Sequence, residues 1–148
     1  MNRVFNASLF KGKVALVTGG ATGIGLAIAS QFLELSSHVI IASRKEDALR
    51  EATDKLNAQY GGAKGGSGVA EPCSYLTCNI REESQVVQLF EKAVERHGKV
   101  DYVINNGGGQ FPAPAQTISK KGWKAVVETN LTGTFMMCRE AHEAGGMG

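Results

Sequence analysis

The sequence predicts an α/β fold of the Rossmann type, with three layers and helices on both faces of a parallel sheet. Four short apolar runs, at 13–17, 38–42, 72–78 and 100–105, alternate with amphipathic segments. Such alternation is typical of βαβ units with right-handed crossovers. Glycines follow the first and fourth runs, and ligands of such sheets bind beyond the carboxyl ends of the strands. We expect the strand order 3-2-1-4.

The composition fits one soluble globular domain and argues against several other classes. The chain has 148 residues, of which 43% are hydrophobic and 20% charged. The net charge of +2 is too small to indicate nucleic acid or a membrane as a partner. The three cysteines have no metal-like spacing, and their odd number favours a reducing compartment. We find no transmembrane run, no secretory signal and no known targeting signal at the C-terminus.

The stretch at 18–25, Thr-Gly-Gly-Ala-Thr-Gly-Ile-Gly, joins the first strand to the first helix. The first N–H groups of a helix have no internal partner, and the helix dipole adds partial positive charge there. Because glycine carries no Cβ, a phosphate can approach such a turn closely. A tight turn without a ligand is the alternative. The predicted cofactor-binding residues of this turn are Gly19, Thr22, Gly23, Ile24 and Gly25.

The first two helices follow from their apolar spacing. The first runs from about residue 23 to 35, with an apolar face formed by Ile24, Ile28, Phe32 and Leu35. Ser36 and Ser37 stand where a C-terminal glycine is usual. The second helix has a stripe of Leu49, Ala52 and Leu56 and ends near Tyr60. The glycine-rich stretch 61–68 then reads as a flexible surface connection.

The turn after the second strand indicates which dinucleotide binds. Domains that bind NAD carry an acid here, which accepts hydrogen bonds from the adenosine ribose. This chain has Ser43, Arg44 and Lys45 instead. A guanidinium suits a 2′-phosphate, because its fork pairs with phosphate oxygens. We therefore predict that Ser43 and Arg44 bind NADP(H); a solvated basic turn is the alternative.

The third and fourth units complete the expected sheet. In the third strand, Cys73 and Cys78 are an odd number of positions apart, so they should point to opposite faces. The third helix has acids in its first turn and Gly98 at its end. The fourth helix begins near Ser119, a plausible N-cap. The apolar face expected for the third helix is Val86, Val87, Phe90, Ala93, Val94 and His97, and for the fourth Trp123, Val126, Val127, Leu131, Phe135 and Met136.

Two motifs identify a family resemblance. The spacing Thr-Gly-x-x-x-Gly-x-Gly, from Thr18 to Gly25, and Asn-Asn-Gly-Gly, from Asn105 to Gly108, resemble the short-chain dehydrogenase/reductase family. Three longer strings, at 41–45, 105–111 and 128–135, resemble its peroxisomal trans-2-enoyl-CoA reductase subgroup. The resemblance covers the chain from Lys11 to about Cys138.

The resemblance implies an activity and further site residues. The activity is NADPH-dependent reduction of trans-2-enoyl-CoA thioesters in fatty acid metabolism, and the implied cofactor is NADP(H). Asn130, a polar amide within an otherwise apolar helix, matches the Asn of the family's Asn-Ser-Tyr-Lys catalytic group. We expect Gln110 and Phe111 at the substrate, although Phe111 could instead pack beneath Pro112 and Pro114. The further cofactor-binding residues are Asn79, Ile80, Asn106, Gly107 and Gly108.

The resemblance also marks what is missing. The family's catalytic Ser, Tyr and Lys lie on and after a fifth strand, and this sequence stops before it. We expect residues 1–148 to be the amino-terminal part of one NADP-binding domain, without the Tyr-x-x-x-Lys motif, inactive and poorly folded alone. The complete parent is expected to be a homo-oligomer, peroxisomal by resemblance or cytoplasmic. The alternatives are another short-chain carbonyl reductase or alcohol dehydrogenase, or a catalytically dead nucleotide-binding module.

Overall fold

The computed structural model, which describes residues 5–62 and 68–144, contains the predicted parallel sheet. Its strands are β1 (Val14–Thr18), β2 (His38–Ser43), β3 (Cys73–Thr77) and β4 (Tyr102–Ile104). The order is β3-β2-β1-β4, and every neighbouring pair is parallel. Both the fold class and the strand order are therefore confirmed. Parts of the predicted lead-in, of the connection at 61–68 and of the chain end lie outside the described residues.

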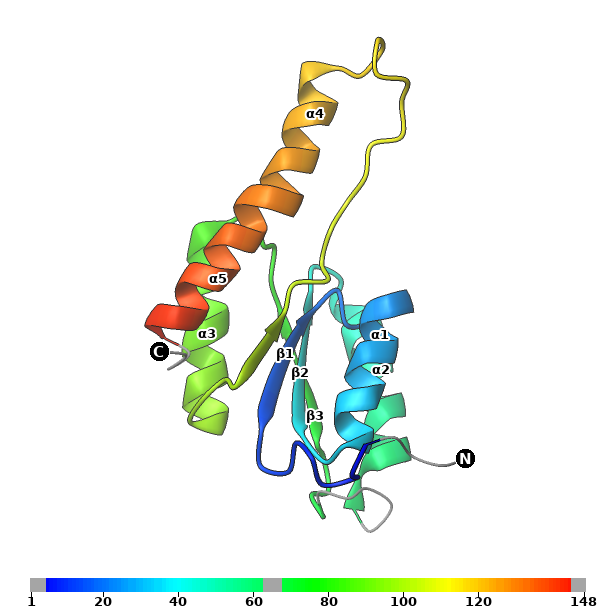
Figure 1. Ribbon diagram of the computed structural model, residues 1–148, viewed down its shortest axis with the longest axis vertical. Helices are drawn as coiled ribbons and strands as arrows, with labels where there is room; N and C mark the ends of the chain where they lie inside the picture. Colours follow the sequence, from blue (N-terminus) through cyan, green and yellow to red (C-terminus); the bar gives the residue numbers. More distant parts are fainter. Residues whose placement is uncertain (1–4, 63–67, 145–148) are drawn as a thin grey trace.

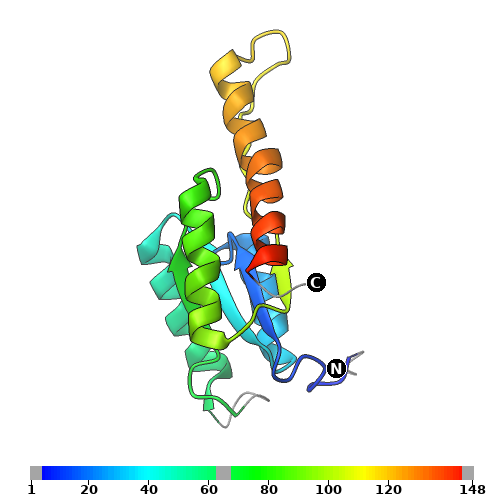
Figure 2. The same cartoon turned by 90° about the vertical axis from the view of Figure 1, so that its left-hand side faces the viewer.

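Helices cover both faces of this sheet, which gives three layers (Figures 1 and 2). One face is covered by α1 (Gly23–Glu34) and α2 (Glu46–Tyr60). The other is covered by α3 (Glu83–His97) and α5 (Gly133–Glu143). Between the loop after β4 and α5 lie α4 (Lys120–Val127) and a single π-helical turn (Glu128–Thr132), here called the π segment. No helix in the described ranges is long and apolar enough to span a membrane.

Two apolar cores fill the space between the layers. All five residues of β1 are buried, and alternate side chains enter opposite cores. Val14 and Leu16 contact the α3 and α5 side, whereas Ala15 and Val17 contact the α1 and α2 side. Cys78 belongs to the first core and Cys73 to the second. The prediction that the two cysteines lie on opposite faces of the sheet is confirmed.

The buried face of α1 differs from the predicted one. Gly25, Ala29 and Leu33 are its buried residues, whereas Ile24 is 75% exposed. Small residues at 25 and 29 let the helix lie close to the sheet, so the larger side chains flank the contact. No glycine follows the C-terminal end of α1. Ser36 adopts the left-handed conformation there instead, with a φ of 72°.

The α2 stripe of Leu49, Ala52 and Leu56 is buried as predicted. The α3 face is confirmed for Val86, Phe90 and Ala93, with Leu89 as a buried member that the pattern missed. Gly98 ends α3 in the left-handed conformation, with φ 78°.

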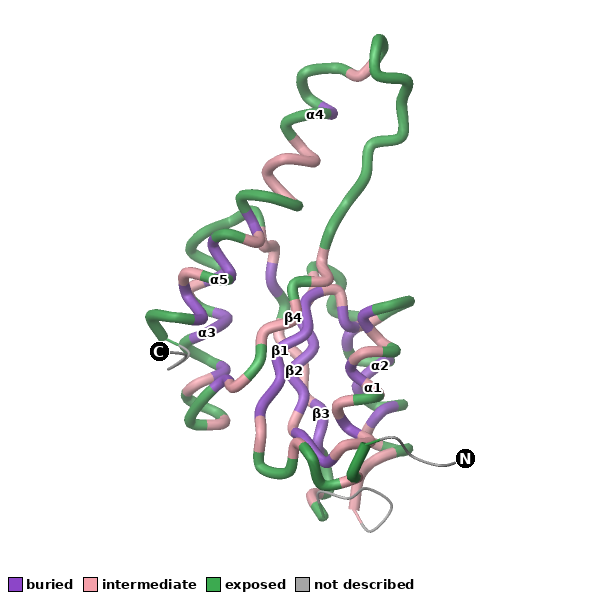
Figure 3. The backbone as a smooth tube through the Cα atoms, viewed as in Figure 1, coloured by how far each residue is buried: buried purple, intermediate pink, exposed green. Residues whose placement is uncertain are grey.

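The helix α4 projects beyond the carboxyl ends of the strands (Figure 1), and most of its residues are exposed or half-buried (Figure 3). Ser119 is its N-cap, and its Oγ accepts a hydrogen bond from the Gly122 N–H at 3.0 Å. The predicted fourth helix continues through the π segment into α5, where Met136 is buried as predicted and Met137 is buried as well. Three other apolar residues predicted to pack are exposed instead, namely Trp123 (62%), Leu131 (68%) and Phe135 (60%).

Candidate cofactor site

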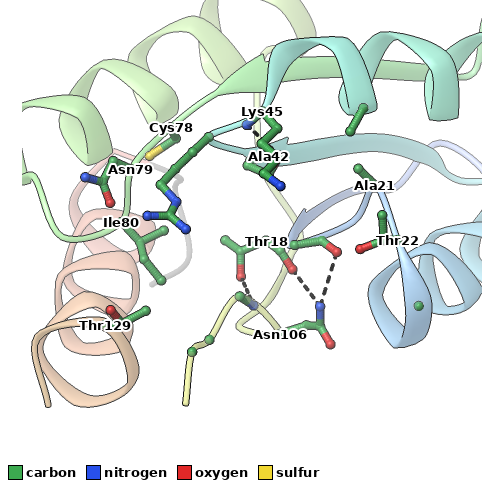
Figure 4. Close-up of a pocket in the computed structure, with 18 of the residues that line it drawn as sticks. Thr18, Ala21, Thr22, Ala42, Lys45, Cys78, Asn79, Ile80, Asn106 and Thr129 are labelled. Carbon is green, nitrogen blue, oxygen red and sulfur yellow. Dashed lines mark hydrogen bonds between the residues drawn. The ribbon is translucent and has the colours of Figure 1, made fainter. Parts of the chain in front are cut away.

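A pocket of about 730 Å³ lies at the carboxyl edge of the sheet, where the loops after all four strands meet (Figure 4). The π segment closes it on one side through Thr129. Every predicted cofactor-binding residue lines this pocket except Gly25, and so does Gln110. Asn130 and Phe111 do not. The sequence therefore predicted correctly which loops form the pocket. The binding roles of their residues remain predictions.

The turn between β1 and α1 forms the centre of the pocket. Gly19 has φ 66°, and a Cβ there would lie 2.9 Å from Asn106 Nδ2. Thr22 is the N-cap of α1 without a side-chain cap, and no acid stands in the first turn. The unpartnered N–H groups and the positive end of the helix dipole are therefore present where Thr22, Gly23 and Ile24 line the pocket.

Gly25 has a packing role rather than direct access to the pocket. A Cβ at Gly25 would overlap Gly19 O and would lie 2.5 Å from Asn106 Nδ2. The absence of a side chain allows α1 to lie against the backbone of the glycine turn. Gly25 does not line the pocket. Its predicted role in cofactor binding remains a prediction, and close packing is an independent reason for glycine at this position.

Asn106 ties the loop after β4 to the first glycine turn. Its Nδ2 donates to Thr18 O at 3.0 Å and to Gly19 O at 3.4 Å (Figure 4). The Gly107 N–H donates to Thr18 Oγ1 at 2.7 Å, and that hydroxyl donates to Ile104 O at 3.2 Å. The side chains of Thr18 and Asn106 therefore hold two walls of the pocket in register.

The turn after β2 places free positive charge at the pocket. Arg44 and Lys45 both line it and are exposed. Within the part of the chain that the structure describes, neither side chain forms an ion pair. The Lys45 N–H donates to Ser43 Oγ at 3.3 Å, which shapes the turn. The two cations are available to an anionic ligand.

The loop after β3 forms the facing wall with Cys78, Asn79, Ile80 and Arg81. The Asn79 N–H donates to Gln85 Oε1 at 2.8 Å, and Asn79 Oδ1 accepts a hydrogen bond from the Arg81 N–H at 3.3 Å. Burial raises the pKa of Cys78 to about 11, so this thiol is neutral at pH 7. Cys78 is a packing group of the core.

Asn130 lies in the π segment and bonds the loop after β4 rather than facing the pocket. Its Oδ1 accepts from the Gly109 N–H at 2.8 Å, and its Nδ2 donates to Gly109 O at 2.9 Å. This reciprocal pair fixes the backbone of a pocket-lining glycine. The catalytic role predicted for Asn130 remains a prediction.

Phe111 packs against α4 rather than against the pocket. A Cβ at Gly122 would lie 2.6 Å from the Phe111 ring, so the ring rests on the surface left by that glycine. The predicted place of Phe111 at the substrate remains a prediction, and so does its alternative packing beneath Pro112 and Pro114.

Sequence reasoning missed Arg81 and Thr129 as pocket residues. Arg81 directly follows Asn79-Ile80, so its position was a usable signal. Thr129 had no such signal, because its placement depends on how the π segment meets the loop after β3. Metal ligands were not expected, and in the described ranges no three His, Cys, Asp or Glu side chains gather as a metal site.

We predicted that the pattern Tyr-x-x-x-Lys is absent from the sequence. This is wrong, because residues Tyr60 to Lys64 match the pattern. Tyr60 is the last residue of α2, does not line the pocket, and its hydroxyl is 2.6 Å from Ser30 Oγ. Lys64 lies outside the described residues. This occurrence therefore does not place a tyrosine at the pocket.

Comparisons with known proteins agree with this geometry. A family model described as short chain dehydrogenase matches residues 13–146. The chain is 33% identical over 129 residues to a probable 2,4-dienoyl-CoA reductase of Bacillus subtilis, covering 87% of this chain and 46% of the relative. It is 33% identical over 142 residues to the peroxisomal 2,4-dienoyl-CoA reductase of Rattus norvegicus, covering 96% and 46%.

Among solved structures, an actinorhodin polyketide ketoreductase with NADPH matches with a TM-score of 0.81 and 35% identity, covering 91% of this chain and 48% of that chain. The chain spans about half the length of the curated relatives it matches.

Proposed function

The chain belongs to the short-chain dehydrogenase family, and from this premise we propose that it forms the cofactor-binding part of an NADPH-dependent reductase of trans-2-enoyl-CoA thioesters. The observation that carries the proposal is the pocket itself. It combines a glycine turn, the amino end of α1 and two cations that form no ion pair within the described residues. NADP(H) as the predicted cofactor agrees with the family and with the NADPH of the ketoreductase structure.

The residues present fit this cofactor by charge and by shape. The absence of a Cβ at Gly19 keeps the turn open, and the first N–H groups of α1 suit a pyrophosphate. Arg44 and Lys45 suit a 2′-phosphate, which NADH lacks. Asn79 and Ile80 line the opposite wall, where the adenine end of the cofactor would lie.

NADPH, when bound, supplies a hydride to the β-carbon of the enoyl thioester. Negative charge then develops on the thioester oxygen and requires a hydrogen-bond donor. The resemblance assigns this donor to the family's catalytic Tyr, and Gln110, which lines the pocket, carries an amide that can donate to the substrate carbonyl. Asn130 holds the backbone of Gly109, the residue before Gln110.

The choice of substrate within the family rests on the dienoyl-CoA reductase relatives and on the subgroup resemblance. The similarity to a polyketide ketoreductase favours a second candidate, reduction of a ketone. NADPH oxidation by the longer parent protein expected from the resemblance, measured with crotonyl-CoA and with a 3-oxoacyl-CoA, separates them. A parent that reduces the ketone and ignores the enoyl thioester contradicts the first candidate. A peroxisomal location belongs to the same proposal and is supported by the name of the rat relative.

Arg44→Ala tests the cofactor. Losing a charge-assisted contact with phosphate costs about 1.5–3 kcal/mol, which is roughly tenfold or more in affinity. We expect the dissociation constant of NADPH to rise by that factor and that of NADH to change little. Arg50→Ala is the matched control, since Arg50 is an exposed arginine on α2 that pairs with Asp47 away from the pocket. Equal losses for both cofactors would contradict the assignment.

Homo-oligomer formation is also part of the proposal. Trp123 in α4, Leu131 in the π segment and Phe135 in α5 are large apolar residues with exposed side chains. Such exposed apolar groups are typical of contact surfaces between proteins. The matching experiment is sedimentation of the chain over a range of concentrations.

A further inference from the structure

An ion pair beside the pocket joins the loop after β3 to the π segment. Arg81 Nη2 lies 2.6 Å from Glu128 Oε2, and the two side chains are 36% and 32% exposed. The second carboxylate oxygen of Glu128 lies 3.4 Å from Lys124 Nζ. The bond from Arg81 holds the pKa of Glu128 below its usual range. Arg81 lines the pocket, whereas Glu128 does not.

Packing next to the ion pair strengthens the same junction. Ile80, which precedes Arg81, lies against Gly133 at the start of α5. A Cβ at Gly133 would lie 3.0 Å from both Ile80 Cγ1 and Ile80 O. Figure 4 shows Ile80 and Thr129 on the same side of the pocket. The π segment is therefore held to the loop after β3 at both of its ends.

The middle of the π segment holds the other wall. Asn130 is two residues after Glu128, and its amide makes both hydrogen bonds to the Gly109 backbone. One turn of helix thus connects the loop after β3, through Glu128, with the loop after β4, through Asn130. A π turn is rare and mostly occurs as a single turn within an α-helix, and such turns often lie at functional sites.

We infer that Arg81 and Glu128 are positioning residues: their ion pair fixes the π segment so that Asn130 holds Gly109 and the adjacent Gln110 at the pocket. The proposed function gives no role to these two residues. Of the measurements that test the inference, only the affinity for NADPH rests on that function. Neither residue needs to touch substrate for this effect.

A purely electrostatic role is the competing explanation, and a charge swap separates the two. Arg81→Glu makes the pocket wall more negative, whereas Glu128→Arg makes it more positive. If only charge matters, the two variants change NADPH affinity in opposite directions. If position matters, both loosen Gly109, and the double variant Arg81→Glu/Glu128→Arg restores the pair and the wild-type behaviour.

The amide exchange rate of Gly109, measured by NMR in the free chain, reports on the Asn130 bond directly. We expect exchange to be about two- to fivefold faster in each single variant, as suits an ion pair of this exposure. The double variant should return to within twofold of wild type. Glu128→Gln, which keeps the shape of the side chain, should give the same loosening if a reversed charge prevents folding.

The control is the swap Glu51→Lys/Lys55→Glu with its two single variants. That exposed ion pair lies within α2, away from the pocket, so breaking it should leave Gly109 exchange unchanged. Asn130→Ala sets the rate expected when the bond to Gly109 is lost completely.

The dissociation constant of NADPH is the second readout and should rise in both single variants. Unchanged Gly109 exchange in the single variants overturns the inference. It is also overturned if the exchange rate of Gly109 in the double variant shows the combined increase of the two single variants. If the wild-type chain does not bind NADPH, the proposed function fails, and the exchange rates still decide the inference.

Discussion

Gly25→Ala is the sharpest test of how the glycine turn is built. Replacing glycine by alanine within a helix normally stabilises a protein by about 0.5–1 kcal/mol, because alanine loses less backbone freedom on folding. Gly25 is the third residue of α1, so propensity alone predicts a gain. The structure predicts a loss instead, because the new Cβ would overlap Gly19 O.

The size of the loss follows from what has to move. The same Cβ would lie 2.5 Å from Asn106 Nδ2, which donates to Thr18 O and Gly19 O. Overpacking of this kind costs about 1–3 kcal/mol. Because the Cβ meets backbone atoms, we take the upper half of that range, about 2–3 kcal/mol, and the net loss after the helix propensity of alanine is about 1–2 kcal/mol. For a chain of this size we expect the melting temperature to fall by roughly 3–8 °C.

Thermal unfolding and NADPH titration of the same samples measure both consequences. We expect NADPH affinity to fall as well, since Asn106 holds the two glycine loops together. Gly109→Ala is the control for stability, because a Cβ at Gly109 would have no neighbour within 4 Å. A Gly25→Ala chain as stable as wild type, with unchanged NADPH affinity, would refute the packing argument.

Three further outcomes can be measured on the same chain. Burial raises the pKa of Asp101, but Lys13, the Val14 N–H and Lys99 outweigh it and hold the pKa below its ordinary value of 3.8. Asp101→Asn should therefore cost about 1 kcal/mol at pH 7. Urea unfolding should show the difference narrowing as the pH falls below 3.8, since a lowered pKa stabilises the fold only while the group is ionised. Burial raises the pKa of Cys73 to about 12 and that of Cys78 to about 11, so Ellman's reagent at pH 8 should label only the exposed Cys138 quickly, and rapid labelling of two thiols would contradict this. Leu131→Glu should weaken any self-association by tenfold or more in sedimentation, because burying a leucine is worth about 1.5–3 kcal/mol.

Much of the fold could be predicted because its signals are local. Strand and helix segments alternate in the sequence, and glycines stand where the strands end, so the sheet order and the pocket loops followed. The buried face of α1 could not be predicted in the same way. Gly25 and Ala29 contribute little hydrophobicity, yet they form the contact because they are small. The predicted face was therefore only partly right: Ile28 and Phe32 pack against the core as partly buried residues, whereas Ile24 is 75% exposed.

The fourth helix shows a second limit. Its apolar residues have helical spacing, but spacing does not reveal which neighbours cover a helix. Met136 and Met137 meet the core, whereas Trp123 and Leu131 lie beyond the edge of the sheet. The π segment arises from contacts with two loops distant in sequence, through Glu128 and Asn130, and no local pattern encodes such contacts.

The cations of the pocket show why partners matter more than residue type. Arg44, Lys45 and Arg81 all line it, and composition cannot rank them. Arg81 is already neutralised by Glu128, which itself also meets Lys124. An anion at Arg81 would have to compete with that carboxylate, whereas an anion at Arg44 or Lys45 meets no such competitor in the described part of the chain. Preference for NADPH over NADH should therefore follow the turn after β2, and changes at Arg81 should act on both cofactors alike.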